Sequence, residues 1–204
     1  MRIALYGATG MIGSRIATEA SSRDHVVTGL SRTQSAALPA GVTPRRGDAA
    51  DADDVARVSA EHDVVVSAIG PSRTGVRHQV FLNTLDVLTE NVGSRRLVVV
   101  GHSASLEVAP GLQLVDAPGY PEAAKPEAQT HRTALQRLRH KGALLDWVYV
   151  SPAPFIALGE RTGSYRVGVN AVFGDTISAE DFAVAIVDEL EQPRAHHDRI
   201  AIAH

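Results

Sequence analysis

Three glycines near the start of the chain are spaced for holding a phosphate group. Gly7, Gly10 and Gly13 follow the apolar run at residues 3–6 and open a stretch with helical spacing. In such a strand–turn–helix, the first glycine permits a tight turn, the second lets the backbone approach a pyrophosphate, and the third lets helix and strand pack closely. The free N–H groups and the positive dipole end of the helix favour the anion. The predicted contacts of a dinucleotide are Gly7, Thr9, Gly10, Met11, Ile12 and Gly13.

The residues that end the second predicted strand indicate which dinucleotide binds. Where NAD-binding folds place an acid against the ribose, this chain has Ser31 and Arg32. A guanidinium can pair with a 2′-phosphate through two hydrogen bonds, and a neighbouring hydroxyl can add another. The sequence therefore predicts NADP(H) in preference to NAD(H), with Arg45 and Arg46 as weaker candidates for the same phosphate. The alternative is that Arg32 is a solvated loop residue.

One acid and three small or apolar residues follow the next two predicted strands. Asp48 comes after residues 42–46 and can accept a hydrogen bond from the adenine amino group. Ala68, Ile69 and Gly70 end the fourth strand, where small residues leave room for the adenosine and the ribose. We expect these positions to line the cofactor site, although each also fits an ordinary structural turn.

The elements that must position these residues alternate between strand and helix. Short apolar runs rich in Val and Ile predict buried parallel strands, and apolar residues at helical spacing predict helices. The expected strands are residues 3–6, 26–30, 42–46, 64–69, 97–100, 144–150 and 200–202. The expected helices are residues 11–20, 52–60, 76–92, 126–140 and 179–190. This order predicts an α/β fold, a Rossmann-type doubly wound parallel sheet in three layers, α/β/α.

The whole chain, residues 1–204, is expected to form a single NAD(P)-binding domain. Its second half contains two irregular stretches, residues 102–121 and 157–177, which are rich in glycine, proline or both. We expect both to be loops on the substrate side of the sheet, with a small C-terminal extension of the domain there.

The composition excludes several kinds of partner and site. The net charge is −3, without a long block of like charge, which argues against a nucleic-acid partner. The chain has no cysteine, so disulfides, thiolate chemistry and cysteine metal sites are excluded. The first apolar run is too short for a signal peptide or a membrane span, so we expect a cytoplasmic protein without a membrane partner. His196 and His197 are adjacent and point apart, so we expect no metal site. A monomer and a dimer both remain open.

Several motifs together resemble those of the atypical short-chain dehydrogenase/reductases. They are residues 6–13, Ser31-Arg32, Gly47-Asp48, residues 67–70 and residues 100–106, with a further similar stretch at residues 131–165. The chain is most similar to the compact NAD(P)H-binding proteins provisionally named NADH-flavin reductases, and to the biliverdin reductase B-like and NmrA-like branches. The resemblance covers essentially the whole chain, and its motifs are more specific for cofactor binding than for a reaction. It implies an NAD(P)H-dependent oxidoreductase.

The general acid of typical short-chain reductases is missing. Those enzymes carry Tyr-x-x-x-Lys, whereas none of the four tyrosines here, Tyr6, Tyr120, Tyr149 and Tyr165, has a lysine four residues later. Tyr120 and Lys125 are five residues apart, which is about 140° around a helix, so they would not share a face. This absence argues against epimerase chemistry and ordinary alcohol oxidation.

Flavin reduction demands less of the protein, because the nicotinamide and the flavin themselves supply the difficult chemistry. The protein need only stack the two rings and exclude water. We therefore expect a reductase of free flavin, bound as a substrate, or of a similar planar acceptor. The resemblance to the biliverdin reductase B-like branch implies that Ser103 lies beside the nicotinamide. His102 is a candidate proton donor with a near-neutral pKa, or else a surface histidine. Lys125 either reaches the same region or is solvated. Pro152 and Phe155, after the sixth strand, complete the expected site.

Two alternatives remain open. A non-catalytic regulator of the NmrA type would bind NADP(H) and a protein partner without turnover. A quinone or aldehyde reductase would use the same fold. Oxidation of NADPH in the presence of FMN, FAD or a quinone separates the enzymes from the regulator.

Overall fold

The computed structural model describes residues 1–33, 38–71, 78–141 and 144–204. Within these ranges, eight strands form one sheet in the order β10-β12-β8-β5-β4-β1-β2-β3. Neighbouring strands are parallel, except that β10 runs antiparallel to β12 at one edge. The strands of this sheet are β1 (Arg2–Tyr6), β2 (Val26–Ser31), β3 (Val42–Arg46), β4 (Val64–Ser67), β5 (Arg96–Val100), β8 (Trp147–Pro152), β10 (Arg166–Gly168) and β12 (Asp198–Ala203).

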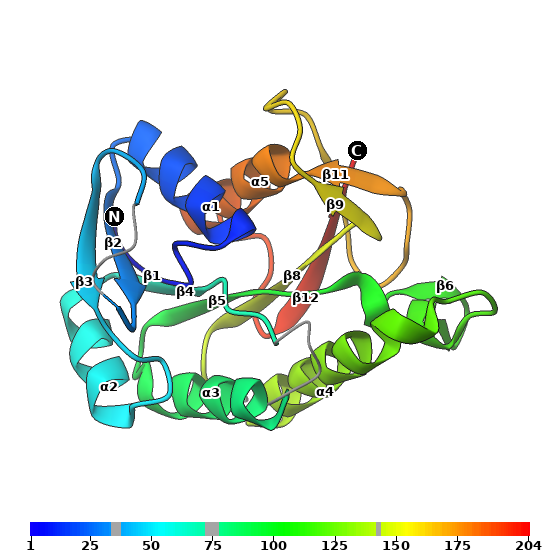
Figure 1. Cartoon of the computed structure of the whole chain (residues 1–204), viewed down its shortest axis with the longest axis horizontal. Coiled ribbons are helices and arrows are strands. Elements are labelled where there is room, and N and C mark those ends of the chain that lie inside the picture. Colours follow the sequence, from blue (N-terminus) through cyan, green and yellow to red (C-terminus); the bar gives the residue numbers. More distant parts are fainter. Residues whose placement is uncertain (34–37, 72–77, 142–143) are drawn as a thin grey trace.

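Helices cover both faces of the sheet (Figure 1). They are α1 (Met11–Ser22), α2 (Ala52–Glu61), α3 (His78–Asn91), α4 (Lys125–Lys141) and α5 (Ala179–Glu191). Because successive strand residues point to opposite faces, Ile3 and Leu5 join the core beneath α1 and α5, whereas Ala4 and Tyr6 join the core beneath α2, α3 and α4. This arrangement confirms the predicted three-layer, doubly wound fold.

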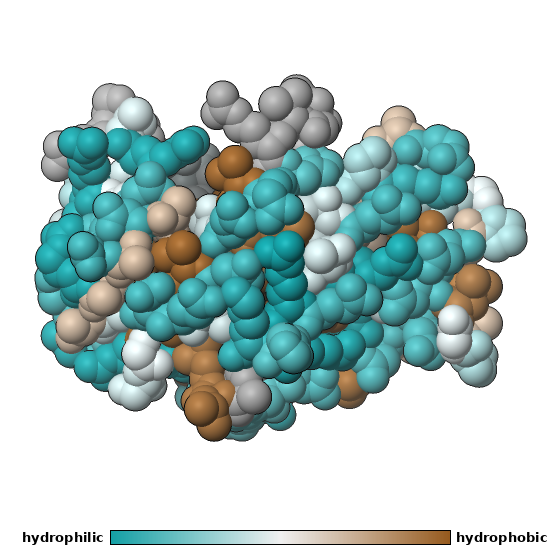
Figure 2. Space-filling model, turned by 90° about the horizontal axis from the view of Figure 1, so that it is seen from below, coloured by the Kyte–Doolittle hydropathy of each residue, from teal (hydrophilic) through white to brown (hydrophobic). Residues whose placement is uncertain are grey.

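The outer side of α2, α3 and α4 is predominantly hydrophilic, with separate hydrophobic patches between the charged groups (Figure 2). Ion pairs link α3 to α4 here: Arg137 Nη1 lies 2.8 Å from Asp86 Oδ2, and Lys141 Nζ lies 2.7 Å from Glu90 Oε1. The exposed pair, Lys141 with Glu90, contributes at most about 1 kcal/mol. No helix within the described residues is both long and apolar enough to cross a membrane.

Several predicted boundaries were wrong or lie outside the described residues. The sixth strand was expected at residues 144–150, but Leu144 is fully exposed and β8 runs from Trp147 to Pro152. Pro152 does not stop the strand earlier, because the pairing of β8 with β5 ends at Val150 and only β12 continues alongside it. The fourth strand ends at Ser67 rather than at residue 69. The expected start of the third helix, residue 76, lies outside the described residues.

The two segments expected to be loops contain short elements and touch each other. The first holds η1 (Ser103–Ser105), β6 (Glu107–Ala109), β7 (Leu112–Gln113) and η2 (Leu114–Asp116), and η3 (Glu122–Ala124) follows it. The second holds β10 and most of β11 (Thr176–Ser178), which pairs with β9 (Phe155–Ala157). The Glu107 N–H donates to the Asn170 carbonyl oxygen at 2.8 Å, and the Val172 N–H donates to that of Glu107 at 2.9 Å. Backbone hydrogen bonds therefore join the two segments to each other.

Candidate functional site

The order of the strands reverses between β1 and β4, which lie side by side in the centre of the sheet. In open α/β sheets, ligands bind outside the carboxyl ends of the strands at such a switch point. Gly7 follows β1 with φ of +81°, a conformation that favours glycine. A Cβ on Gly7 would lie 2.7 Å from the Ala68 carbonyl oxygen and 3.1 Å from the Ile69 nitrogen. The structure thus brings Gly7, Ala68 and Ile69 together at the switch point.

The other two glycines of the loop have different surroundings. A Cβ on Gly13 would lie 2.1 Å from the carbonyl oxygen of Gly7, so this position requires glycine for the loop to pack on its own helix. A Cβ on Gly10 would have the same oxygen as its nearest neighbour, but at 3.4 Å. Thr9 and Gly10 are both exposed. Gly10 therefore leaves open space where a ligand can approach the backbone.

The N-terminus of α1 has the properties of an anion site. Gly10 is the N-cap and supplies no capping side chain, and the first turn holds no acidic residue. The Ser14 N–H donates to the Gly10 carbonyl oxygen, whereas the N–H groups of Met11, Ile12 and Gly13 have no acceptor among the residues that the structure describes. Unpaired N–H groups at the positive end of a helix dipole bind phosphate. This loop and helix fit a dinucleotide pyrophosphate.

The end of β2 presents the residues expected at the ribose. Ser31 Oγ donates to the Thr33 carbonyl oxygen at 2.6 Å, and Arg32 is exposed. No ion-pair partner of Arg32 occurs in the described part of the chain. By contrast, Arg45 Nη1 donates to Glu61 Oε2 at 2.6 Å, so this weaker candidate is already paired. Arg46 is exposed.

Asp48 has a role in its own turn. Its Oδ1 accepts a hydrogen bond from the Ala50 N–H at 3.0 Å, and its own N–H donates to Asp54 Oδ2 at 2.7 Å. A Cβ on the preceding residue, Gly47, would lie 2.9 Å from the same Asp54 oxygen. The turn is therefore fixed by Asp54, and the exposed Asp48 side chain lies at the carboxyl end of β3.

His102 lies after β5 at the start of η1 and is partly buried. Its Nδ1 accepts a hydrogen bond from the Ala104 N–H at 2.9 Å, which places the proton of the neutral ring on Nε2. Burial lowers its pKa to about 4, so the expectation of a near-neutral pKa was wrong. The next residue, Ser103, is buried.

The remaining predicted residues lie in different environments. Lys125 begins α4 and pairs with the exposed carboxylate of Glu122. Tyr120 is partly buried and packs against the small apolar cluster of Ala104, Val115 and Ala128 rather than pairing with Lys125. Pro152 is buried at the end of β8. Phe155, in β9, is 71% exposed.

The sequence analysis missed His131, in the middle of α4. The ring is almost fully buried, and its Nε2 is the nearest atom to a Cβ built on Gly70, at 4.0 Å. It stacks on His102 with ring centres 5.0 Å apart, and its Nδ1 lies 3.2 Å from the Tyr149 hydroxyl oxygen. A signal was present, because His131 shares helical spacing with the apolar Leu135 and so belongs to the buried face of the predicted helix.

Acid is expected to destabilise the protein through two histidines, the partly buried His102 and the buried His131. Burial lowers the pKa of His102 to about 4, and burial together with the neighbouring His102 and His78 lowers that of His131 to about 3, from the ordinary 6.5. Between pH 6.5 and these values the unfolded chain binds more protons than the folded one. The free energy of unfolding is therefore fully retained above pH 6.5 and falls as the pH falls, by roughly 1.4 kcal/mol per pH unit for each histidine.

Urea unfolding between pH 7 and pH 5 measures this slope. His131→Leu should reduce the slope of the free energy of unfolding with pH by the contribution of about one proton. Replacing the exposed His140 in the same way should leave the slope unchanged. A wild-type free energy of unfolding that does not vary over this range contradicts the expectation.

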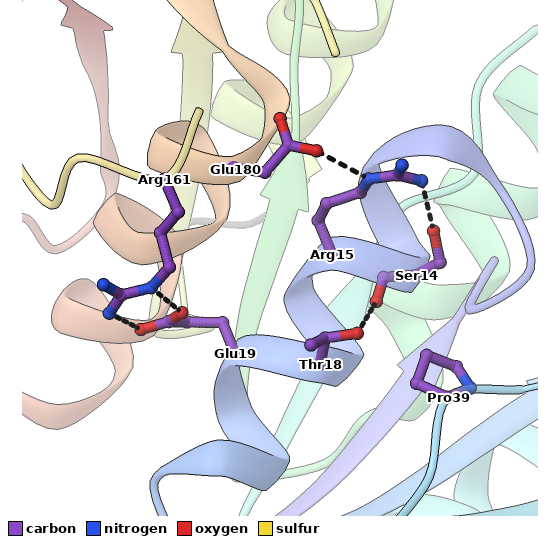
Figure 3. Close-up of a pocket in the computed structure, with 7 residues that line it drawn as sticks. All are labelled: Ser14, Arg15, Thr18, Glu19, Pro39, Arg161 and Glu180. Carbon is purple, nitrogen blue, oxygen red and sulfur yellow. Dashed lines mark hydrogen bonds and ion pairs between the residues drawn. The ribbon is translucent and has the colours of Figure 1, made fainter. Parts of the chain in front are cut away.

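A surface pocket of about 380 Å³ lies on the side of α1 that faces away from the sheet (Figure 3). Its charged side chains already form two ion pairs: Arg15 Nε lies 3.2 Å from Glu180 Oε1, and Arg161 Nε lies 2.7 Å from Glu19 Oε2. The hydrogen bonds from Arg161 are the main reason that the pKa of Glu19 is lowered. Because Arg161 lies within residues 157–177, its pair with Glu19 links that segment to α1, whereas the pair of Arg15 with Glu180 links α1 to α5.

Comparisons with known proteins agree with this geometry. Residues 7–193 match the family model described as NAD(P)H-binding. Protein YwnB of Bacillus subtilis (strain 168) is 33% identical over 214 residues, covering 99% of this chain and 98% of its own. A solved structure from Burkholderia pseudomallei, provisionally described as an exported protein, is 43% identical over all of both chains, with a TM-score of 0.89. One from Streptococcus pneumoniae TIGR4, provisionally described as an NADH-flavin reductase, is 28% identical over 100% of this chain and 99% of its own, with a TM-score of 0.88.

Proposed function

The chain belongs to the NAD(P)H-binding family, and from this premise we propose that it is an NADPH-dependent reductase of free flavin or a similar planar acceptor. The observation that carries the proposal is the uncapped N-terminus of α1 at the β1–β4 switch point, with an arginine and no acid at the end of β2. NADPH, when bound, supplies the hydride. The protein's part is to hold the pyrophosphate on residues 7–13 and to seat the acceptor beside the nicotinamide.

The proposed acceptor side lies at the carboxyl ends of β4, β5 and β8. Gly70 is exposed there, and Phe155 offers an exposed aromatic face on which a planar ring can stack. Ser103 and His102 lie at the same end of the sheet. The similarity to the Streptococcus pneumoniae protein described as an NADH-flavin reductase supports flavin as the first acceptor to test.

Turnover decides between this reductase and a regulator that binds the cofactor without reaction. We expect the purified protein to oxidise NADPH when FMN, FAD or a quinone is supplied. The reaction is measured as the loss of absorbance of the reduced nicotinamide. The rank of the three acceptors identifies the substrate class. Tight binding of NADPH with no oxidation in any of the three would support the regulator and contradict the reductase.

Arg32 is the proposed determinant of the preference for NADPH over NADH. Charge-assisted hydrogen bonds to a 2′-phosphate are worth about 1.5–3 kcal/mol, so Arg32→Ala should raise the Kd of NADPH by about 10- to 100-fold and leave that of NADH nearly unchanged. Fluorescence titration of each cofactor measures both constants. Arg46→Ala is the matched control, because it removes a nearby exposed arginine. Equal affinity of the wild-type protein for the two cofactors would show the proposed preference to be wrong.

The proposal includes a cytoplasmic location, because the reduced cofactor is supplied inside the cell. The relative described as exported makes this a point to measure. We expect the protein in the cytoplasmic fraction after cell fractionation, as a monomer or a dimer by light scattering. Recovery of the protein outside the cytoplasm would overturn this part of the proposal.

A further inference from the structure

His131 brings a polar atom from a buried helix face to the open end of the sheet. Its ring is only 5% exposed, because α4 packs it against the core between Phe81, His102 and Tyr149. Yet Nε2 lies 4.0 Å from the Cβ position of Gly70, which is exposed after β4. Among the described residues, Nε2 has no hydrogen-bond partner. It is nevertheless absent from the side-chain atoms that are both fully buried and unpaired, so the atom itself keeps some accessible surface. The nitrogen therefore faces the space beyond Gly70.

The Tyr149 hydroxyl is the hydrogen-bond partner of the other ring nitrogen of His131, Nδ1. The Tyr149 side chain is fully buried, and a Cβ on Gly101 would lie 2.1 Å from its ring, so the ring is held in one position. Burial raises the pKa of Tyr149, so the hydroxyl stays protonated, and its oxygen accepts a hydrogen bond from the His102 backbone N–H. Its own proton has two acceptors within reach, His131 Nδ1 at 3.2 Å and the His131 carbonyl oxygen at 3.4 Å, and Nδ1 is the nearer of the two. An Nδ1 that accepts leaves the ring proton on Nε2.

We propose that the Nε2–H of His131 is a catalytic hydrogen-bond donor to the hydride acceptor, aimed past Gly70 at a carbonyl oxygen or ring nitrogen of a planar conjugated molecule. This inference rests on the proposed reductase function. Tyr149 is the positioning residue that sets the tautomer. His102 stacks on the ring, with His78 nearby on α3.

The chemistry requires a donor of a hydrogen bond rather than of a proton. Hydride transfer breaks the C–H bond of the reduced nicotinamide and forms a new bond to hydrogen on the acceptor. Negative charge then develops on a conjugated oxygen or nitrogen of the acceptor. The neutral His131 stabilises that charge with its N–H and keeps its proton, and a proton from water neutralises the acceptor. The low pKa of His131 suits this role, because the ring stays neutral at pH 7.

Variants at position 131 test the role of the donor. Removal of one such donor costs about 10²- to 10³-fold in kcat in other enzymes, so His131→Leu should lose that much while the Kd of NADPH stays unchanged. His131→Gln keeps an N–H near the position of Nε2 and should recover most of the rate. His140→Leu, on the exposed end of the same helix, is the matched control. A His131→Leu protein with wild-type kcat would overturn the proposal.

A second variant leaves the buried ring in place. Among the described residues, a Cβ on Gly70 has only His131 Nε2 within 4.0 Å, so Gly70→Ala fits the fold and places a methyl group in front of the N–H. We expect a loss of kcat similar to that of His131→Leu, at saturating NADPH and with an unchanged Tm. Full activity in Gly70→Ala would contradict the proposed direction of the donor.

Nitrogen-15 NMR of the histidine rings gives a readout that does not depend on turnover. At pH 7 we expect His131 to carry its proton on Nε2, and this resonance to shift when oxidised FMN or a quinone is added. A protonated Nδ1 or a cationic ring overturns the proposal. If the wild-type protein oxidises no NADPH, the proposed function fails separately. The role of His131 in holding the acceptor is then supported by the shift or overturned by its absence.

Discussion

Gly10→Ala is expected to weaken NADPH binding by at least about 10-fold while the free protein keeps its fold, whereas Gly13→Ala should damage both. A Cβ on Gly10 meets its nearest neighbour at 3.4 Å, which the structure tolerates, but it fills the space through which a phosphate reaches the N–H groups of α1. A Cβ on Gly13 would lie 2.1 Å from the backbone oxygen of Gly7, and backbone cannot move aside cheaply. Overpacking of this kind costs about 1–3 kcal/mol or more.

The two glycine variants are compared by the Tm of the free protein and by the Kd of NADPH. For a chain of this size, about 1 kcal/mol corresponds to about 2–4 °C in Tm, so Gly13→Ala should lower the Tm by several degrees. Gly10→Ala should lower it much less, by no more than the loss of a glycine N-cap. Gly10→Ala with unchanged affinity would mean that the pyrophosphate does not lie on this loop.

Arg96→Met is expected to lower the free energy of unfolding by about 3–5 kcal/mol, because it leaves a buried carboxylate without its partner. Glu189 is completely buried and accepts from Arg96 Nη2 at 2.6 Å and from the Arg194 N–H at 3.0 Å. Arg96 Nη2 also donates to the Ala195 carbonyl oxygen at 2.8 Å. The pair therefore joins the start of β5 to α5 and to the segment that leads into β12.

Urea unfolding at pH 7 measures this effect, with Arg2→Met as the matched control. The Arg2–Asp63 pair has a similar distance, 3.0 Å, but its side chains are 55% and 42% exposed, so its loss should cost at most about 1 kcal/mol. The double variant Arg96→Met, Glu189→Met should recover part of the lost stability, because it removes the buried carboxylate that Arg96→Met leaves unpaired. Equal losses in Arg96→Met and Arg2→Met would show that burial of Glu189 does not matter.

The first half of the fold could be predicted because its signals are local. Continuous apolar runs such as residues 64–67 can be buried only in the interior of a sheet, and Gly7 and Gly13 mark a turn that no other residue fits. The short strands β6, β7, β9, β10 and β11 could not be predicted. Each has two or three residues, too few for a periodic pattern. β9, β10 and β11 also depend on partners distant in the sequence, whereas β6 and β7 pair with each other across a short turn.

The parts of the candidate site that depend on backbone geometry could be predicted from the sequence. The parts that depend on how side chains pack could not. The contact of Gly7 with Ala68 follows from two neighbouring parallel strands. The pKa of His102 follows instead from its burial, and α4, which stacks His131 on it, comes about thirty residues later. His131 gave only the weak signal of a polar residue on an apolar helix face. Its proximity to Gly70 depends on how α4 lies on the sheet.

Arg199 has a consequence for exchanging segments between this chain and a relative. This buried guanidinium donates to Ser105 Oγ at 2.7 Å, within residues 102–121, and to Asn170 Oδ1 at 2.8 Å, within residues 157–177. The backbone bonds between Glu107 and Asn170 join the same two segments. A chimera that takes only one of them from a relative separates groups that bond to one another. The two segments therefore have to be exchanged as a single cassette, together with the residue at position 199.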